Sequence, residues 1–221
     1  RSDVLESAAR QVADVEDAKD GGVSVTVTDA DLTDVGLARA AHLEGLSRLV
    51  LNGTRVTDAG LAPLEVSRSL RGLDLSNTAI TDHASLNLSR LVGLTELSLA
   101  DTEFSDRGLS RLEGLVKLES LDLAGLPITA DGLAAALPRL PALRHLNLSE
   151  TWIVNDDLRL LATAKNLSSL SLRDTVVGDR GVLVISKLKG LKRLWIERTR
   201  ITPMGLEQLK KALPECEIFG P

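Results

Sequence analysis

The side chains able to carry acid–base, nucleophilic or metal chemistry are few in this chain of 221 residues. It holds three histidines and one cysteine, which are His42, His83, His145 and Cys216. Catalysis needs such groups within hydrogen-bonding reach of one another, and a zinc site needs them at short fixed spacings. The sequence has no H-E-x-x-H, paired-cysteine, P-loop, G-x-G-x-x-G or G-x-S-x-G motif. We therefore predict no catalytic residue, no cofactor and no enzymatic activity.

One aspartate recurs at a regular spacing along the chain. Asp34, Asp58, Asp82 and Asp106 follow one another at intervals of 24 residues, and Asp179 stands in a similar context. A column of carboxylates could bind calcium, but calcium-binding β-roll repeats are far shorter, about nine residues. Most of these aspartates follow a Thr or Ser and precede x-Gly-Leu, which is typical of the first turn of a helix. We therefore predict helix starts here and no metal site.

The aspartates belong to a longer sequence repeat, and the strands and helices of that repeat determine where the aspartates lie. The string L-x-x-L-x-L recurs at spacings of 24 or 25 residues and begins at Leu46, Leu70, Leu94, Leu118, Leu143, Leu167 and Leu191, the last copy ending in Ile. Val25 and Val27 stand in a degenerate first copy. Side chains two apart on a strand share a face, so each string predicts a short strand with its leucines inward. A threonine-led half, seen in residues 54–61 and 102–109, completes each unit.

This pattern resembles the leucine-rich repeat family, L-x-x-L-x-L-x-x-N/C-x-L, and its second half is similar to the cysteine-containing and bacterial subtypes. The resemblance implies an α/β, right-handed solenoid with parallel strands on the concave face and short helices on the convex face. One column departs from the family, because threonine replaces its Asn or Cys. We expect these hydroxyls to form a hydrogen-bond ladder from loop to loop: Thr54, Thr78, Thr102, Thr151, Thr175 and Thr199.

The chain is predicted to be a single domain with a cap at each end, since terminal repeats expose their core. Residues 1–21 are predicted to be an N-terminal capping helix, because apolar residues recur at helical spacing over 2–19 (Leu5, Ala8, Val12 and Val15). Residues 22–213 hold eight repeats, and residues 214–221 form a closing strand. Cys216 is then a small buried apolar residue.

Composition and charge exclude several classes of protein. The chain is 43% hydrophobic with a net charge of −5, which argues against disorder and against nucleic-acid binding. No apolar run approaches the roughly 18 residues of a membrane span, so we expect no membrane insertion. A single cysteine allows no internal disulfide and favours the cytoplasm or a bacterial cell envelope. The chain is expected to be a monomer.

The outward strand positions, which the core does not use, form the predicted partner-binding surface. Its middle is acidic, with Asp74, Glu96, Asp101, Asp122 and Glu150, while His145 and Asn147 follow further along the chain. The C-terminal end places Arg173, Arg193 and Arg198 around Trp195. Since Trp and Arg are enriched in binding hot spots, Trp195 is the first predicted contact residue. Its alternative role is packing under the C-terminal cap or against the neighbouring arginine side chains. Trp152 is either a rim contact or a lid over the irregular Leu126-Pro127 segment.

The sequence thus predicts a non-catalytic protein–protein interaction module that binds a protein or peptide through the concave face. The family resemblance implies roles in substrate-adaptor recognition or at the cell envelope. Two alternatives stay open. The chain is either the recognition part of a larger effector enzyme or ligase adaptor whose active domain lies outside it, or a structural spacer used in assembly.

Overall fold

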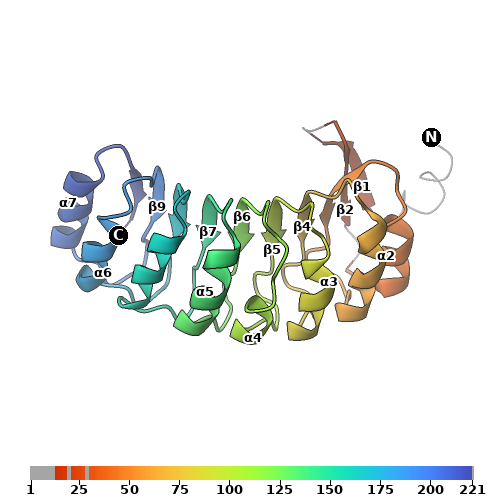
Figure 1. Cartoon of the computed structure of the whole chain (residues 1–221), viewed down its shortest axis with the longest axis horizontal. Helices are drawn as coiled ribbons and strands as arrows, with labels where there is room; N and C mark the ends of the chain where they lie inside the picture. The colour runs from red at the N-terminus through yellow and green to blue at the C-terminus, as the bar shows by residue number, and fades with distance from the viewer. Residues whose placement is uncertain (1–12, 19–20, 28–29, 221) are drawn as a thin grey trace.

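The structure, a computed structural model, describes residues 13–18, 21–27 and 30–220 (Figure 1). These residues form one ten-stranded sheet in which the strands follow the order of the chain. Strands β2 to β9 are parallel, and a helical segment connects each of them to the next. Figure 1 shows the strands side by side along the long axis, with the helices on the outer side of a shallow arc. The predicted α/β solenoid is confirmed.

Most of the strands are three residues long and most of the helices have one or two turns, because a 24-residue unit must hold one of each. The strands are β1 (Ala13–Asp17), β2 (Val23–Val27), β3 (Leu46–Val50), β4 (Gly72–Asp74), β5 (Glu96–Ser98), β6 (Ser120–Asp122), β7 (His145–Asn147), β8 (Ser169–Ser171), β9 (Arg193–Trp195) and β10 (Glu217–Phe219). The α-helices are α2 (Asp34–Ala40), α3 (Ser85–Ser89), α4 (Asp106–Leu109), α5 (Ala130–Ala136), α6 (Asp179–Ile185) and α7 (Pro203–Ala212). The 3-10 helices are η1 (Asp58–Val66), η2 (Asp82–Ala84), η3 (Leu137–Arg139) and η4 (Asp157–Thr163).

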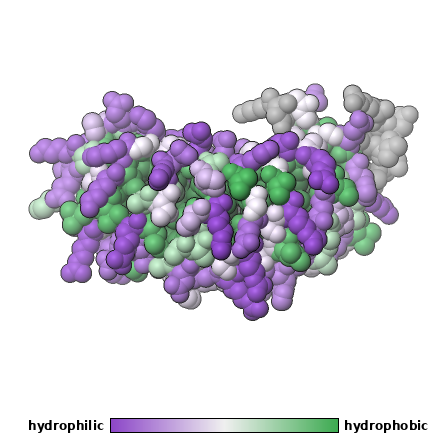
Figure 2. All heavy atoms as spheres, viewed as in Figure 1, coloured by the Kyte–Doolittle hydropathy of each residue, from purple (hydrophilic) through white to green (hydrophobic). Residues whose placement is uncertain are grey.

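Layers of leucine fill the space between the sheet and the helices. The inward positions Leu49 and Leu51 are fully buried, and the same positions of later repeats are buried too: Leu73, Leu75, Leu97, Leu99, Leu121, Leu123, Leu146, Leu148, Leu170 and Leu172. Phe104 is the large exception and is also fully buried. Figure 2 shows hydrophilic side chains along the whole length of the outer surface, with smaller apolar patches between them. One continuous apolar core therefore runs through the repeats.

The N-terminal cap differs from its prediction, because residues 13–17 form a strand and not a helix. β1 pairs antiparallel with β2. Shortly before β2, Gly21 takes φ +81°, and its N–H donates to Ala18 O at 2.9 Å. A left-handed residue at this point explains why glycine stands there.

The physical reason for the error is an ambiguity of period. The spacing of Val12 and Val15 fits a helix, but the alternation of apolar and acidic residues over 13–16 fits a strand equally well. Only the strand supplies backbone partners to the open edge of β2. Three of the residues used to predict the helix lie outside the described residues: Leu5, Ala8 and Val12.

At the C-terminal end β10 pairs parallel with β9, where the sequence predicts a closing strand. Cys216 precedes this strand and packs half-buried against the core. Burial raises the pKa of the Cys216 thiol, which disfavours the reactive thiolate.

The threonine column does not form the predicted ladder from loop to loop. Thr54 Oγ1 donates to Leu51 O of its own repeat at 2.8 Å. The equivalent hydroxyls do the same three residues back: Thr78, Thr102, Thr151, Thr175 and Thr199. Each hydroxyl therefore closes its own turn and makes no bond to the next repeat.

The aspartate column links the repeats instead. Asp106 Oδ1 accepts the Thr129 N–H at 2.9 Å, and its Oδ2 accepts the Thr129 hydroxyl at 2.6 Å. The same two-bond clasp joins Asp34 to Thr57, Asp58 to Thr81, Asp82 to Ser105 and Asp179 to Thr202. These aspartates also begin helices, as predicted. Each carboxylate thus serves both its own helix and the following loop.

The exceptions to the clasp follow the same chemistry. Asn155 has one carbonyl oxygen, and its partner Gly178 has no hydroxyl; the oxygen accepts Gly178 N–H at 2.8 Å and Gly181 N–H at 3.0 Å. One repeat earlier, Val154 stands where the threonine should be, and its N–H donates to Asp157 of its own repeat at 2.9 Å. In the preceding unit Ala130 occupies the aspartate position, and Asp131 stands one residue after it. Among the described repeats, this junction lacks the clasp.

We predict that Asp82→Ala lowers the free energy of unfolding by about 1–3 kcal/mol, because the half-buried donors of Ser105 and Gly108 lose their acceptor. Urea denaturation measures this change. Asp131→Ala is the matched control, since no clasp depends on that carboxylate, and it should cost less than about 1 kcal/mol. Equal losses in the two variants would show that the clasp does not stabilise the stack.

Leu123→Ala is expected to cost about 2–5 kcal/mol, the usual range for a fully buried leucine. Chemical denaturation checks the value. A loss under about 1 kcal/mol would be incompatible with a close-packed leucine layer at this repeat.

Candidate functional site

Two rows of side chains cross the open face of the sheet, one on each side of the buried leucine row. The first row follows the register Ser24, Arg48, Gly72, Glu96, Ser120, His145, Ser169, Arg193, Glu217. The second follows Thr26, Val50, Asp74, Ser98, Asp122, Asn147, Ser171, Trp195, Phe219. The predicted contact residues lie in these rows, except Arg173 and Arg198, which follow β8 and β9 at the rim.

Trp195 is held by the last strand of the sheet. Its ring stacks on Phe219 with centroids 5.1 Å apart and planes 10° from parallel, and the Arg193 guanidinium lies 5.8 Å from the Trp195 ring centroid. This packing is the alternative role that the sequence left open. The half-buried Trp195 ring still lines a depression of about 250 Å³ on the sheet face, together with Asp122, His145 and Asn147. Sequence reasoning missed Phe219, although it stands 24 residues after Trp195.

The arginines at the C-terminal end are largely neutralised by carboxylates of the neighbouring repeat. Arg173 donates to both oxygens of Glu197, at 2.8 and 2.6 Å, and Arg198 pairs in the same bidentate way with Asp174. Hydrogen bonds from these arginines lower the pKa of both Glu197 and Asp174. Of the three arginines predicted around Trp195, Arg173 and Arg198 therefore have their charges paired, whereas Arg193 has no ion pair among the described residues.

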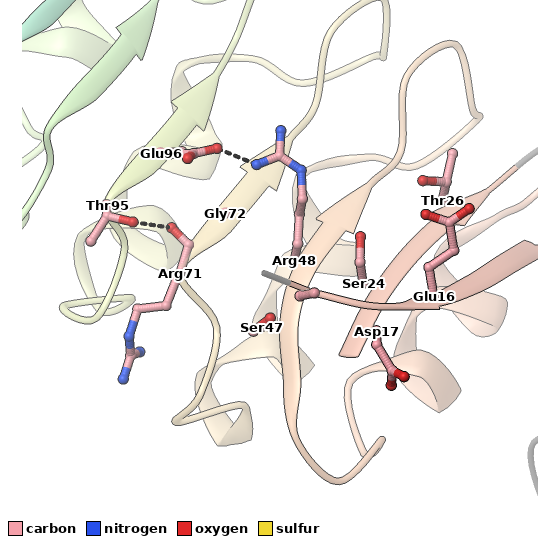
Figure 3. A pocket seen from close by; sticks show the side chains of 11 residues that line it. Glu16, Asp17, Ser24, Thr26, Ser47, Arg48, Arg71, Gly72, Thr95 and Glu96 are labelled. Atoms are coloured by element: carbon pink, nitrogen blue, oxygen red, sulfur yellow. Dashed lines mark hydrogen bonds and ion pairs between the residues drawn. The ribbon is translucent and has the colours of Figure 1, made fainter. Parts of the chain in front are cut away.

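Arg48 and Glu96 form a further ion pair across two repeats. Gly72 lies between them in the register and has no side chain to block the contact. This pair borders a groove of about 910 Å³ at the N-terminal end of the face, where β1 supplies the exposed Glu16 and Asp17 (Figure 3). The groove is polar and contains no aromatic side chain.

The carboxylates in the middle of the face have no such partners. In the part of the chain that the structure describes, no ion pair involves Asp74, Asp101, Asp122 or Glu150. Asp101 and Glu150 stand at the rim with φ of 54° and 59°. The left-handed backbone there lets the Asp101 N–H donate to Ala124 O, and the Glu150 N–H to Arg173 O, each at 2.9 Å.

Three residues of the second row also shape the turns that follow their strands. Asp74 Oδ1 accepts from Ser76 N–H at 2.9 Å and from its hydroxyl at 2.6 Å. Asn147 accepts from Ser149 in the same way, and Asp122 Oδ1 accepts from Ala124 N–H at 3.0 Å. These side chains therefore have a structural role as well as an exposed position.

Two titratable groups on the face depart from their ordinary behaviour. Burial raises the pKa of Asp122, and the nearby carboxylates of Asp74 and Asp101 add to the increase. Burial, followed by the positive charge of Arg193, lowers the pKa of His145. At neutral pH His145 is therefore uncharged and offers one donor and one acceptor.

Two solved structures have the same architecture as this chain. Internalin C2 from Listeria monocytogenes superposes with a TM-score of 0.67 at 23% identity, over 90% of this chain and 80% of that one. A Leptospira interrogans protein gives 0.52 at 21% identity, over 82% of this chain but only 50% of that one. This is the leucine-rich repeat fold. No family model and no curated protein matches the sequence.

The described part of this leucine-rich repeat array contains little that could support chemistry. It holds no group of three His, Cys, Asp or Glu side chains arranged to bind a metal ion. None of its helices is long and apolar enough to span a bilayer. Trp152 is 68% exposed at the rim, so most of its ring faces solvent. The open face of the sheet instead presents polar and aromatic side chains that could contact a partner.

We predict that Asp122→Asn raises the free energy of unfolding at pH 7. The folded protein disfavours the Asp122 charge, whereas an asparagine can still accept the Ala124 N–H, as Asn147 accepts from Ser149. Because the folded-state pKa is raised, the wild type regains stability as the pH falls through that pKa, and the gain is complete below the unfolded value.

The stability difference between the variant and the wild type should therefore shrink on acidification. Urea denaturation of both proteins across this pH range measures the difference, and effects of other groups cancel in it. A variant that is less stable than the wild type at pH 7 would contradict the assignment.

Proposed function

We propose that this chain is a non-catalytic protein–protein interaction module that binds a protein or peptide segment through the concave face of β2 to β9. One observation carries the proposal. Parallel sheets almost always have both faces covered, but here the helices cover one face only. The open face presents two continuous rows of polar and aromatic side chains that the core does not use.

The chemistry of these rows supports binding. A half-buried tryptophan backed by an aromatic ring, a neutral histidine, an amide and several hydroxyls form a mixed surface of the kind found at protein interfaces. His145 lies between Ser120 and Ser169 in the register, but among the described residues no hydrogen bond joins it to either hydroxyl, so contact is the simplest use of the face. The same face would serve if the chain were the recognition part of a larger effector or adaptor.

A photo-crosslinking amino acid placed at two positions tests the proposal. Ser120 lies on the open face in β6, whereas Leu183 is 65% exposed on α6, on the helical side. In the native host, the Ser120 probe is expected to form discrete adducts with a partner protein, and the Leu183 probe is not. Adducts from Leu183 alone would place the contact on the helices and refute the proposal.

Trp195→Ala is predicted to weaken binding of the crosslinked partner by about 30-fold, or about 2 kcal/mol, as for other aromatic hot spots. Leu183→Ala is the control, since that side chain is exposed on the helical side, and it should leave the affinity unchanged. Circular dichroism establishes that both variants fold. Calorimetric titration measures the affinities, and equal affinities in the three proteins would remove Trp195 from the contact.

A further inference from the structure

We propose that the occupant of the open face is an extended, positively charged segment of a partner protein, with an apolar or aromatic side chain that packs on Trp195. This inference rests on the proposed function and names the chemistry of the partner. It follows from the free charge of the face, the rigid aromatic site at one end and the spacing between the two.

The free charge of the face is negative. Of the arginines along it, Arg48 is paired with Glu96, Arg173 with Glu197 and Arg198 with Asp174, whereas Arg193 has no ion pair among the described residues. In the column just before the first row, Arg144 is paired with Glu119 and Lys192 with Glu215, whereas Arg71 has no ion pair among the described residues. The carboxylates of the face without an ion pair among the described residues outnumber these free cations: Glu16, Asp17, Asp74, Asp101, Asp122, Glu150 and Glu217, of which Asp74 and Asp122 are half-buried.

A cation on the partner would bind these carboxylates most strongly at Asp122, which is partly shielded from water. The charges of Asp74 and Asp101 both repel the ionised Asp122 carboxylate and raise the free energy of that form. A lysine or arginine placed beside Asp122 reverses that repulsion, and a basic segment would approach the face faster than a neutral one. Complementary charge thus selects a basic occupant over an acidic one.

The Trp195 ring is a prepared site for an apolar side chain. Phe219 holds one face of the ring by stacking, so binding orders no free aromatic side chain. The depression of about 250 Å³ between Trp195 and the His145–Asn147 strand has room for a side chain of the partner. The Arg193 guanidinium lies against the ring without an ion pair among the described residues, so a basic residue of the partner is disfavoured here and is expected beside the carboxylates instead.

The register of the sheet fixes the distance between the two features. Asp122 and Trp195 are three strand steps apart and Asp74 and Trp195 five, which is roughly 14 and 24 Å at about 4.8 Å per strand. An extended peptide covers about 3.3 Å per residue, so these spans correspond to about four and seven residues. We therefore expect basic residues four to seven positions from an apolar or aromatic residue.

A random 12-residue peptide library displayed on phage tests the inference with the intact chain as bait. Enriched sequences are expected to be rich in Lys and Arg, with an apolar or aromatic residue at the stated spacing. Synthetic peptides from this set should bind more weakly as salt rises. Enriched sequences that are neutral or acidic, or a selection that enriches nothing, would overturn the inference.

Two double variants with the same loss of charge locate the effect. Asp101→Asn with Asp122→Asn removes carboxylates from the open face, whereas Asp131→Asn with Glu207→Gln removes exposed carboxylates from helices α5 and α7. The first is expected to weaken the selected peptides by at least about tenfold and the second to leave them unchanged. Equal weakening would reduce the effect to net charge and overturn the inference.

The outcomes separate this inference from the proposed function. Peptides that are not basic but lose affinity in Trp195→Ala would leave the concave face as a binding surface and reject only the charge selection. Both proposals would be rejected by peptides that bind the wild type and Trp195→Ala equally and do not block crosslinking of the partner to the Ser120 probe.

Discussion

Stacking of identical leucine layers is the interaction on which the whole molecule depends. A single unit of 24 residues has too little surface to bury its own apolar face, so each unit is stable only against its neighbours. Parallel strand pairing and the aspartate clasp then fix the position of one unit on the next. Since every layer has the same shape, residues 24 apart become neighbours, and the open face inherits straight rows of side chains.

Much of this arrangement could be predicted from the sequence, because one period governs the strands, the core and the helix starts. The buried leucines, the inward Phe104 and the aspartates at the helix starts all follow from it. The N-terminal strand could not be predicted in this way. It lies outside the period, and five residues with both helical and alternating spacing do not decide between a helix and a strand.

The sequence does not predict which side chains form the hydrogen bonds between repeats, for a related reason. Thr54 and Asp58 both recur once per unit, and either hydroxyl or carboxylate could reach the next repeat. Which one does so depends on the rise and rotation between units. The ion pair of Arg173 with Glu197 and the stack of Trp195 on Phe219 did leave a signal, because both pairs are 24 residues apart. Comparing charges and aromatics across one period would have found them.

The junction without a clasp, at Val154, has a consequence for how the array responds to stress. In a one-dimensional stack, cooperativity depends on the coupling between neighbouring units. Elsewhere a carboxylate adds two hydrogen bonds to that coupling, whereas at this joint Val154 bonds within its own repeat. Under heat or pulling force the array would divide here first, into an N-terminal block that carries Asp74, Asp101 and Asp122 and a C-terminal block that carries Glu150 and Trp195. A ligand that contacts both blocks would therefore also stabilise the weakest interface between repeats of the solenoid.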